Sequence, residues 1–541
     1  MATHTVFNQV PPLDGYNPAD YPVIADALVQ AGATDAFPEV HEVGAMAGSA
    51  EVIELGDLAE AHPPVLTTHD RYGNRIDEVA YDPSYHELMR HATSFGLHGT
   101  PWEDQRPHAH LVRAVKMHLW GQADPGHLCP ISMTYAVVPA LRANPELAKQ
   151  FEPGLAAREY DFGLRAPHTK RALIAGMSMT EKQGGSDVRA NTTRAVQQPD
   201  GTYSITGHKW FTSAPMSDLF LTLANTDAGV TCFLVPRVLP DGTRNPFFLQ
   251  RLKDKLGNRS NASSEVEYDN TVGYLVGEEG RGVPTIIEMV NMTRLDCTLA
   301  TGTLMRVGVQ QAAHHAAHRK AFGAYLTDQP LMQNVLADLA IEAEGATLVG
   351  LWLASLVDRG DDQAQALRRV GLAVSKYYVC KRGPMHAAEA LECLGGNGYV
   401  ENSRMPRLYR EAPLLSIWEG SGNVAALDLL RALAKQPAAL GVFFDEIEQS
   451  AAHDRTLAGS LTSLKDQFTD FDSLQYRARY VVGQMAQLLQ ASLLVRYGNP
   501  AVAEAYVRSR IGAEHGDVFG TLPVGVDTGT IIDRATPKVA S

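Results

Sequence analysis

The order in which hydrophobic periods follow one another constrains the fold of this chain more than any other feature. From Tyr85 to about residue 170, apolar residues recur at three- and four-residue spacing, which predicts amphipathic helices. From Arg171 to about residue 285, short β-prone runs alternate with turn residues, and the helical spacing then returns from Gly282. The pattern predicts an α+β protein in which a β-domain is flanked in sequence by helical domains.

The middle segment contains a strong hairpin signal. Asp200 and Gly201 stand between the β-prone runs TTRAVQQP and TYSITGHKWFTS. RALIAGMSMT precedes them as a candidate for a buried strand, and LFLTLANT, TCFLVPRV and SEVEYDNTVGYLVG follow. Short strands separated by turn signals predict a small β-barrel or sandwich.

Four domains follow from these changes, and a length of 541 residues is compatible with several domains. We expect an irregular lead with an N-terminal helical domain (1–170), a middle β-domain (171–285), a helical bundle (286–435) and an extra C-terminal helical domain (436–541). The segment from Gly282 is expected to hold two long helices. The tail from Val518 is rich in Gly and Thr and is expected to be loose.

Charge and apolar patterning disfavour some classes of protein. A net charge of −14 gives no long-range attraction to nucleic acid or to an anionic membrane. No apolar run approaches the roughly 18 residues of a membrane span, and the N-terminus lacks the pattern of a signal peptide. The cysteines are scattered and never spaced as CxxC, which predicts buried reduced thiols in a cytoplasmic protein. They are Cys129, Cys232, Cys297, Cys380 and Cys393.

One acid stands out between helical segments. In LLSIWEGSGNV (Leu414–Val424), Glu419 lies between the ring of Trp418 and a flexible Gly-Ser-Gly run. A carboxylate in this setting can act as a base over a planar substrate, since the small residues let backbone approach closely. The alternative is an ordinary helix-capping turn.

Four further stretches have residues suited to a flat, phosphorylated ligand. MTEKQGGSD (Met179–Asp187) places hydroxyls around a glycine pair, and KWFTS (Lys209–Ser213) ends a β-run with rings and hydroxyls. RKAFG (Arg319–Gly323) joins a cation to a ring, and GGNGY (Gly395–Tyr399) permits close backbone approach. The alternatives are a Gly-Gly turn, a core aromatic pair, a charge at a helix C-terminus and a simple turn. GxGxxG and P-loop patterns do not fit MTEKQGGSD.

A histidine-rich stretch, HHAAH, does not read as a metal site. Helical spacing places His314 and His318 on one face, with His315 beside them. No carboxylate or cysteine nearby completes a ligand set, so we predict no metal.

Taken together, the domain order and MTExxGGSD at the entrance of the β-domain resemble the flavin-dependent acyl-CoA dehydrogenases over about residues 80–435. The N-terminal lead, the phrases MTEKQGGSDV, DKLGNRSNAS and SIWEGSGN, and the added C-terminal helices resemble the AidB branch, an alkylation-response relative. The resemblance implies noncovalent FAD between the β-domain and the bundle. It assigns cofactor contacts to Met179, Thr180, Gly185, Ser186, Phe211, Ser213, Arg319, Phe322, Gln333, Gly395, Gly396, Ser421 and Asn423.

Within this set the resemblance also implies roles. Thr180 would bond the flavin pyrimidine edge, Ser186 the pyrophosphate and Ser213 the flavin N5/O4 edge, with Phe211 packed on the ring. Arg319, Phe322 and Gln333 match a pattern that reaches the FAD of a neighbouring subunit, and Gly395 and Gly396 match a second such contact. This sharing implies at least a dimer, and the family is usually a tetramer built as a dimer of dimers.

The same resemblance places Glu419 on the catalytic base of the family. The base would remove the α-proton of an acyl-CoA thioester while the β-hydrogen leaves as hydride to flavin N5. The thioester carbonyl would be polarised by the backbone N–H of Glu419 and a ribityl hydroxyl. Some members carry the base directly before an arginine on an earlier helix, but here Thr293 precedes Arg294, so no acid is available there.

Two positions depart from the family pattern. Glu392 stands where a glutamine usually helps to hold FAD, and an anion beside a pyrophosphate is unfavourable unless it is protonated or turned away. Trp418 replaces the usual tyrosine before the base, and its larger ring would narrow the acyl pocket.

Other functions stay open at this point. An AidB-type role would be binding of double-stranded DNA and protection against alkylating agents, with the extra C-terminal domain as the DNA module. Residues 436–541 contain 2 Lys and 7 Arg against 8 Asp and 4 Glu, a net charge of −3, which disfavours strong binding. A local cluster is the form such a site would take, with a solvated helix face as the alternative reading. Its candidate members are Arg477, Arg479, Arg496, Arg508 and Arg510. Oxidase chemistry on the same scaffold is a third alternative.

Overall fold

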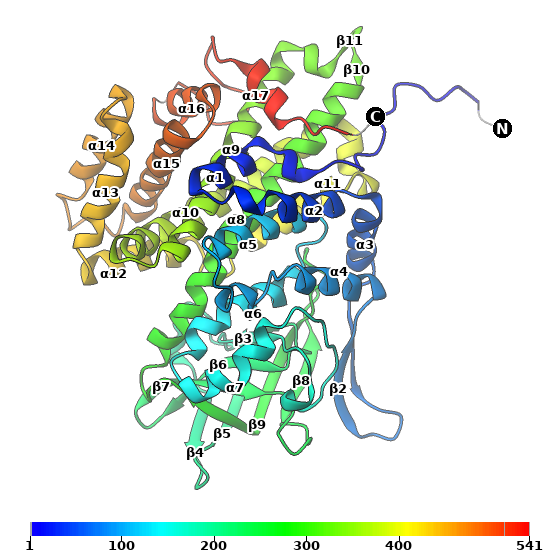
Figure 1. Cartoon of the computed structure of the whole chain (residues 1–541), viewed down its shortest axis with the longest axis vertical. Helices are drawn as coiled ribbons and strands as arrows, with labels where there is room; N and C mark the ends of the chain where they lie inside the picture. The colour runs from blue at the N-terminus through cyan, green and yellow to red at the C-terminus, as the bar shows by residue number, and fades with distance from the viewer. Residues whose placement is uncertain (1–2, 513, 540–541) are drawn as a thin grey trace. The chain divides into compact units, whose positions relative to one another are not determined.

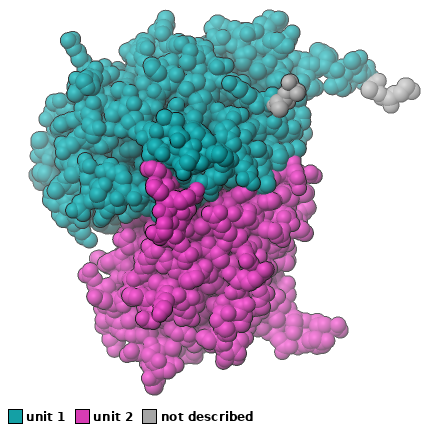
Figure 2. All heavy atoms as spheres, viewed as in Figure 1, with its two compact units in different colours: residues 1–50, 110–122, 294–541 teal, residues 51–109, 123–293 magenta. Residues whose placement is uncertain are grey.

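The computed structural model describes residues 3–512 and 514–539. The chain forms two compact units, coloured separately in Figure 2. Unit 1 consists of residues 1–50, 110–122 and 294–541, and unit 2 consists of residues 51–109 and 123–293.

Unit 2 contains a β-barrel and the helices that precede it in sequence (Figure 1). Its helices are α3 (Ala50–Ala61), α4 (Pro83–Ser94), α6 (Leu128–Leu141) and α7 (Pro145–Ala156), and β1 (Val65–His69) pairs with β2 (Arg75–Ala80). The other strands are β3 (Ala175–Ser178), β4 (Arg194–Gln197), β5 (Tyr203–Ser213), β6 (Leu219–Thr226), β7 (Gly229–Pro236), β8 (Phe247–Leu252) and β9 (Ser263–Val276).

The predicted hairpin and barrel are both confirmed. β4 and β5 are antiparallel neighbours, and Gly201 has the positive φ of +86° that their turn requires. The pairings run β4–β5–β9–β7–β6 and return from β6 to β4, so the sheet closes on itself. β3 adds parallel to β6, and β8 adds to β9. The barrel core includes the buried side chains of Ile205, Phe220 and Phe233.

Unit 1 is helical, apart from the short hairpin of β10 (Lys320–Ala321) and β11 (Ala324–Tyr325). α10 (Asp362–Glu392) contacts helices on several sides, namely α9 (Pro330–Arg359), α11 (Met405–Leu415), α12 (Gly422–Lys435), α13 (Ala438–Ala451) and α15 (Ala478–Tyr497). Figure 1 shows α13 and α15 beside α14 (Arg455–Gln467) and α16 (Pro500–Tyr506). The remaining helices are α1 (Pro22–Ala31), α2 (Phe37–Ala47), α5 (Ala109–Trp120), α17 (Thr528–Ala535) and α8 (Gly282–His318), of which residues 282–293 belong to unit 2.

Short 3-10 segments and one π-helix complete the elements. The 3-10 segments are Pro18–Asp20, Thr34–Ala36, Thr100–Trp102, Pro167–Thr169, Val188–Ala190, Leu326–Asp328, Gly395–Tyr399 and Glu401–Ser403, and the π-helix is Val507–Ile511.

Where two long helices were expected from Gly282, the structure has one, α8, which is 37 residues long. Gly302 and Gly308 lie inside it at points of close packing. A Cβ at Gly302 would stand 3.4 Å from the backbone of Thr347, and one at Gly308 would stand 3.1 Å from Ala390. Tertiary packing against α9 and α10 therefore outweighs the low helix propensity of glycine.

The lead is more regular than predicted. α1 lies on the short helical pattern YPVIADALVQAG of the sequence, and α2 and α3 are regular helices as well. Prolines in the first turn begin α1 and α2, a position at which the missing N–H costs no hydrogen bond. Ile24, Leu28 and Val40 are buried, so these helices are stabilised by an apolar face.

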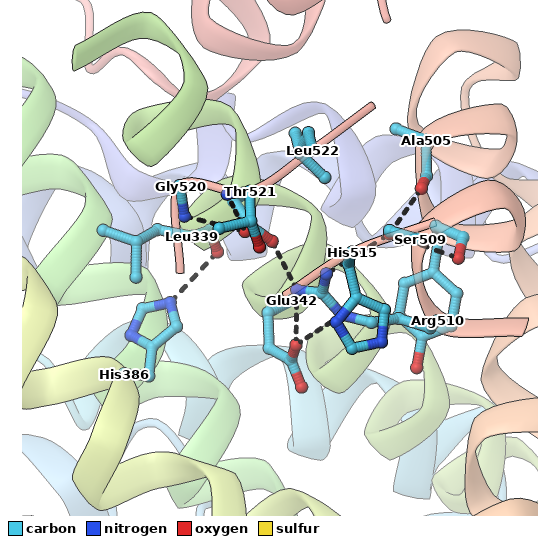
Figure 3. A network of polar contacts seen from close by, with 12 residues as sticks. Leu339, Glu342, His386, Ala505, Ser509, Arg510, His515, Gly520, Thr521 and Leu522 are labelled. Carbon is cyan, nitrogen blue, oxygen red and sulfur yellow. Dashed lines mark hydrogen bonds and ion pairs between the residues drawn. The ribbon is translucent and has the colours of Figure 1, made fainter. Parts of the chain in front are cut away.

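The tail from Val518 is likewise not loose. Phe519 and Leu522 are buried, and the backbone N–H groups of Gly520 and Thr521 donate to the Asp338 carboxylate of α9 at 2.9 and 3.4 Å (Figure 3). Composition alone predicted a loop, but acceptors on α9 satisfy its backbone.

The structure also tests the predictions made for the cysteines and for membrane-spanning segments. All five cysteines are buried and free, which confirms the predicted reduced thiols. Among the described residues one helix, α9, is long and apolar enough to cross a membrane, and 83% of its most apolar window is buried within the protein.

Candidate functional site

Glu419 lies in the turn that joins α11 to α12, with a backbone φ of +56°. The next residue, Gly420, has a φ of +104°. A non-glycine residue in the left-handed region costs on the order of 1–3 kcal/mol and persists only where its surroundings hold it. The contacts of this turn therefore show what keeps the carboxylate in place.

Two buried cations from different helices hold the turn. Arg294 of α8 donates through Nε to the Glu419 carbonyl at 2.9 Å, and Lys376 of α10 donates through Nζ to the Gly420 carbonyl at 2.5 Å. Lys376 is only 1% exposed. Hydrogen bonds from charged donors are worth about 1.5–3 kcal/mol each, which is enough to offset the cost of the positive φ.

Asp428 of α12 in turn positions Arg294. Its carboxylate accepts from Arg294 Nη1 at 2.8 Å and from Arg369 of α10 at 3.0 and 3.2 Å. Burial raises the pKa of Asp428, but the Arg369 hydrogen bond and the Arg294 charge outweigh it and hold the pKa below its usual value. The carboxylate thus stays ionised and fixes the guanidinium that bonds the turn.

The side chain of Trp418 packs on an apolar cluster next to Glu419. The members of this cluster are Cys297, Leu304, Cys380, Ala387, Ala412 and Leu415. On α8, the Thr293 hydroxyl donates to carbonyls of its own helix, at 3.0 Å to Val290.

In unit 2 the stretch Met179–Ser186 is fixed by its backbone. Trp210 N donates to the Thr180 carbonyl at 2.8 Å, and Asn191 Nδ2 donates to the Met179 carbonyl at 3.0 Å. The Thr180 hydroxyl has no hydrogen-bond partner in the described part of the chain. A Cβ at Gly185 would stand 2.6 Å from that hydroxyl, so a larger residue there would force the Thr180 side chain to shift. Ser186 is exposed.

A buried ion pair supports this stretch from below. The fully buried Glu181 carboxylate accepts from Lys209 Nζ at 3.0 Å and from the backbone N–H groups of Thr192 and Thr193. Burial raises the pKa of Glu181, but the Lys209 charge and these hydrogen bonds bring it down to about 2. The ionised pair therefore anchors the residue that follows Thr180.

The end of β5 presents a ring and a hydroxyl. Phe211 is 51% exposed, and the Ser213 hydroxyl lies 3.1 Å from that of Ser263 on β9. Thr212 between them is buried, whereas Phe211 is exposed and Ser213 is partly exposed, so Phe211 and Ser213 point to the same side of the barrel, away from its core.

In unit 1 the hairpin after α8 carries Phe322 at its tip, fully exposed and with a φ of +53°. The Arg319 guanidinium donates to the Asn8 carbonyl, and Asn8 exchanges two 2.9 Å hydrogen bonds with the backbone of Lys320. Gln333 Nε2 donates to the Thr327 carbonyl at 2.8 Å. The N-terminal segment thus helps to shape this hairpin.

Two exposed glycines follow α10, and two exposed polar residues begin α12. A Cβ added at Gly395 or Gly396 would meet no atom within 4 Å, and Gly395 has a φ of +60°. Ser421 is the N-cap residue of α12 without a side-chain cap bond, and Asn423 is exposed.

Comparison with known proteins decides the family. The N-terminal domain model of the adaptive response protein AidB matches residues 8–162, and the middle and C-terminal domain models of acyl-CoA dehydrogenases match residues 176–271 and 280–434. Over 518 residues the chain is 42% identical to the Escherichia coli (strain K12) protein named AidB, an alignment that covers 95% of each chain. The chain belongs to the AidB branch of the acyl-CoA dehydrogenase family.

Solved structures of acyl-CoA dehydrogenases share this fold. Caenorhabditis elegans ACDH-11, solved in complex with C11-CoA, has a TM-score of 0.85 at 27% identity and covers 94% of this chain and 93% of its own. An acyl-CoA dehydrogenase from Bacillus anthracis complexed with FAD has a TM-score of 0.62 at 17% identity, covers 84% of this chain and 79% of its own, and supports the fold alone.

The sequence analysis did not single out Lys376, Asp428 or Asn8. Lys376 interrupts the apolar run VGLAVSKYYVC in a predicted helix, and this is the one signal that could have found it. Asp428 and Asn8 carry no local signal, because their partners are distant in sequence.

In the extra C-terminal helices of this AidB-type chain, the candidate DNA-binding arginines do not form an open cluster. Arg496 pairs with Glu446 at 2.5 Å, and Arg510 pairs with Asp338 and Glu342. Arg477 pairs with Asp470, and Arg508 with Glu504 and Glu514. Of the five candidates, Arg479 alone has no acidic partner among the described residues.

No group of three metal-ligating side chains occurs in the described ranges. The ring of His314 lies 2.9 Å from the Pro11 carbonyl and 4.4 Å, between centroids, from the ring of His318. This pair packs beside the N-terminal segment.

Proposed function

We propose that the protein is an FAD-dependent oxidoreductase that oxidises an acyl-CoA-type thioester, with Glu419 as the base. The observation that carries the proposal is the turn at Glu419. It combines a left-handed carboxylate residue with two cationic donors from separate helices. Such a backbone cost is characteristic of functional positions, because packing alone gives no reason to hold an acid in this conformation.

The residues of unit 2 fit a flavin. The Thr180 hydroxyl has no partner in the described part of the chain, and a Cβ at Gly185 would crowd it at 2.6 Å. The open hydroxyl beside a glycine suits a polar ring edge placed close to backbone. Phe211 offers an exposed ring and Ser213 a hydroxyl on the same face. These residues would hold the flavin. Ser186 would contact the pyrophosphate.

The chemistry of the residues follows from their types. FAD, when bound, accepts the β-hydride at N5. The Glu419 carboxylate takes the α-proton, and its backbone N–H polarises the thioester carbonyl. Arg294 and Lys376 keep this carboxylate and this N–H in one orientation, so both act on the same substrate without reorganisation.

We also propose that the active form is at least a dimer, built as a dimer of dimers in the tetramer. Phe322 at the hairpin tip and Leu331 at the start of α9 are 101% and 83% exposed in unit 1, and both lie within the stretch from Arg319 to Gln333. Exposed apolar side chains at a structured hairpin are typical of a protein interface. A cytoplasmic location is part of the same proposal, on the ground of the five buried free thiols.

The acyl group is expected to be accommodated next to Trp418. Because this ring is packed on the apolar cluster between α8, α10 and α11, it is held in a fixed position. The DNA-binding alternative has weaker support, since four of its five candidate arginines are engaged with acids of the chain itself.

Anaerobic titration of the FAD-loaded protein with short, branched and long acyl-CoAs tests the proposal. We expect one class to bleach the flavin, and Glu419→Gln to slow that bleaching by about 10²- to 10⁴-fold, the usual contribution of a general base. Glu448→Gln, a change at an exposed acid of α13 that pairs with Lys465, is the control and should leave the rate within a factor of a few. Full activity of Glu419→Gln would exclude the assigned base. If no acyl-CoA reduces a flavin that dithionite does reduce, the DNA-binding alternative gains support.

A further inference from the structure

Three side chains of unit 2 form a continuous chain of hydrogen bonds that ends at Ser213. Lys255, in the loop after β8, donates through Nζ to the Ser263 hydroxyl at 3.1 Å. The Ser263 hydroxyl lies 3.1 Å from the Ser213 hydroxyl. Ser213 and Ser263 are directly opposed in the antiparallel ladder of β5 and β9, so the sheet itself fixes their separation.

The types of the three side chains indicate which one donates in each of these hydrogen bonds. A hydroxyl both donates and accepts, so two facing serines can bond in either sense. A lysine ammonium only donates, so Ser263 must accept from Lys255. Within the described residues the Ser213 oxygen is the one acceptor within reach of the Ser263 proton, so donation from Ser263 to Ser213 is the arrangement that gives this proton a partner. The proton of Ser213 is then left to point outward, away from Ser263.

We infer that Lys255 is a positioning residue which, through Ser263, makes Ser213 an obligate hydrogen-bond donor toward the N5/C4-carbonyl edge of the bound flavin. This inference rests on the proposed function, because it needs FAD at Ser213. N5 of oxidised flavin is an acceptor, and the C4 carbonyl accepts in both redox states and gains negative charge on reduction. A donor that is oriented before reduction stabilises that charge. The hydrogen bonds from Lys255 through Ser263 to Ser213 therefore raise the reduction potential of the flavin.

Lys255 is held in place for this role. Its Nζ also donates to the Asn261 carbonyl at 2.5 Å, which orients the ammonium toward Ser263. With Ser263, Lys253 and Arg259 it lines a cavity of about 120 Å³.

The neighbouring Lys253 offers a matched control. Its ammonium pairs with Glu265 at 2.6 Å and lies 3.3 Å from the centroid of the Trp210 ring and 4.7 Å from that of Phe211. It therefore carries the same charge on the same loop. Its backbone N–H donates to the Ser263 carbonyl at 2.7 Å, but its ammonium bonds neither serine hydroxyl. Any effect that depends on charge alone should appear in Lys253→Met as well.

The test compares wild type, Lys255→Met, Lys255→Arg, Ser263→Ala, the double variant Lys255→Met with Ser263→Ala, and Lys253→Met, each loaded with FAD. Three quantities are measured: the visible flavin spectrum, the reduction potential by spectroelectrochemistry, and the FAD dissociation constant. We expect Lys255→Met and Ser263→Ala to lower the potential, shift the flavin bands in the same direction and weaken FAD binding by about 5- to 10-fold, the equivalent of one lost hydrogen bond. The double variant should match the single ones, and Lys255→Arg should retain most of the wild-type values.

Several outcomes overturn the inference. An FAD-loaded Lys255→Met or Ser263→Ala with the wild-type spectrum and potential contradicts it, as does an equal shift in Lys253→Met or full additivity in the double variant. If Lys255→Met does not fold, as judged by its thermal midpoint, Ser263→Ala and Lys255→Arg still decide. A wild-type protein that binds no FAD would remove the proposed function and this inference together. A wild-type holoprotein with unaltered variants would remove only the inference.

Discussion

At the scale of single residues, the position of the carboxylate depends on cations that do not touch the reacting atoms. Lys376 is the clearest case, because its buried ammonium has the Gly420 carbonyl as its hydrogen-bond acceptor at 2.5 Å. We expect Lys376→Met to leave FAD binding intact and to slow flavin reduction by acyl-CoA about 10- to 100-fold, since small displacements of a catalytic group have effects of that size. Stopped-flow reduction measures this rate.

The control for this change is Lys435→Met on α12, an exposed lysine away from the turn. A normal reduction rate in Lys376→Met would show that Arg294 alone holds the turn. A loss of FAD or of folded protein would instead show that Lys376 is needed for the core, and Lys376→Arg, which restores a donor, would then separate the two roles.

Glu419 could be found from the sequence, but the residues that hold its turn in place could not. A glutamate between a ring and small residues is a local pattern, and the resemblance to a family gave it a role. Lys376 and Asp428 lie 43 residues before and 9 residues after Glu419, and their bonds depend on how α8, α10 and α12 pack. Local spacing carries no information on such contacts.

At the scale of elements, the barrel was predictable from local sequence patterns, whereas the order of the C-terminal tail depends on contacts with residues distant in sequence. The hairpin at Asp200–Gly201 was predictable because its turn chemistry is local. The tail was not, because its order comes from α9 and α10. Asp338 of α9 bonds Gly520 and Thr521, and the ring of Phe519 lies 4.7 Å from the guanidinium of Arg382 on α10. The prediction of two helices in place of α8 failed for a related reason. The glycines inside α8 lie at close contacts with other helices, which local sequence does not reveal.

A buried ionic network joins this tail region to α9 and α10, and it predicts a pH dependence (Figure 3). Glu342 accepts from Arg382 at 3.1 Å and from Arg510 at 2.9 Å. Burial raises the pKa of Glu342, but the two guanidinium charges outweigh it and lower the pKa to about 2, against 4.5 for an ordinary glutamate. The unfolded chain therefore binds the proton more readily, so this stabilisation is complete above about pH 4.5 and is lost as the pH falls toward 2.

Glu342→Gln tests that dependence. At pH 7 we expect it to lower the thermal midpoint strongly, because removing one member of a buried ionic network costs about 3–5 kcal/mol. The difference from wild type should shrink as the pH is lowered below 4.5. Glu448→Gln, which breaks an exposed pair with Lys465, is the control and should change stability by about 0–1 kcal/mol. A wild-type midpoint for Glu342→Gln at pH 7 would contradict the prediction.

At the scale of the whole molecule, charge and exposed apolar surface set what the chain associates with. A net charge of −14, with arginines already paired to acids, gives little attraction for DNA phosphates. A fully exposed phenylalanine at the tip of an ordered hairpin, in contrast, presents an apolar side chain that a second copy of the chain can bury. Domain order and family were predictable from sequence at this scale, since they are carried by long patterns and shared motifs.

The last prediction concerns this association. Phe322→Asp places a charge at the hairpin tip, so we expect light scattering to show a smaller oligomer. We also expect a lower FAD content in the same fractions, because the residues around Phe322 match the pattern that reaches the cofactor of a neighbouring subunit. Phe471→Asp, at another highly exposed phenylalanine (74%) in the loop after α14, controls for a charge at an exposed ring. A smaller oligomer with full FAD content would separate assembly from cofactor binding. An unchanged oligomer would place the interface elsewhere, since a carboxylate buried in an apolar contact without a partner cannot be accommodated without loss of affinity.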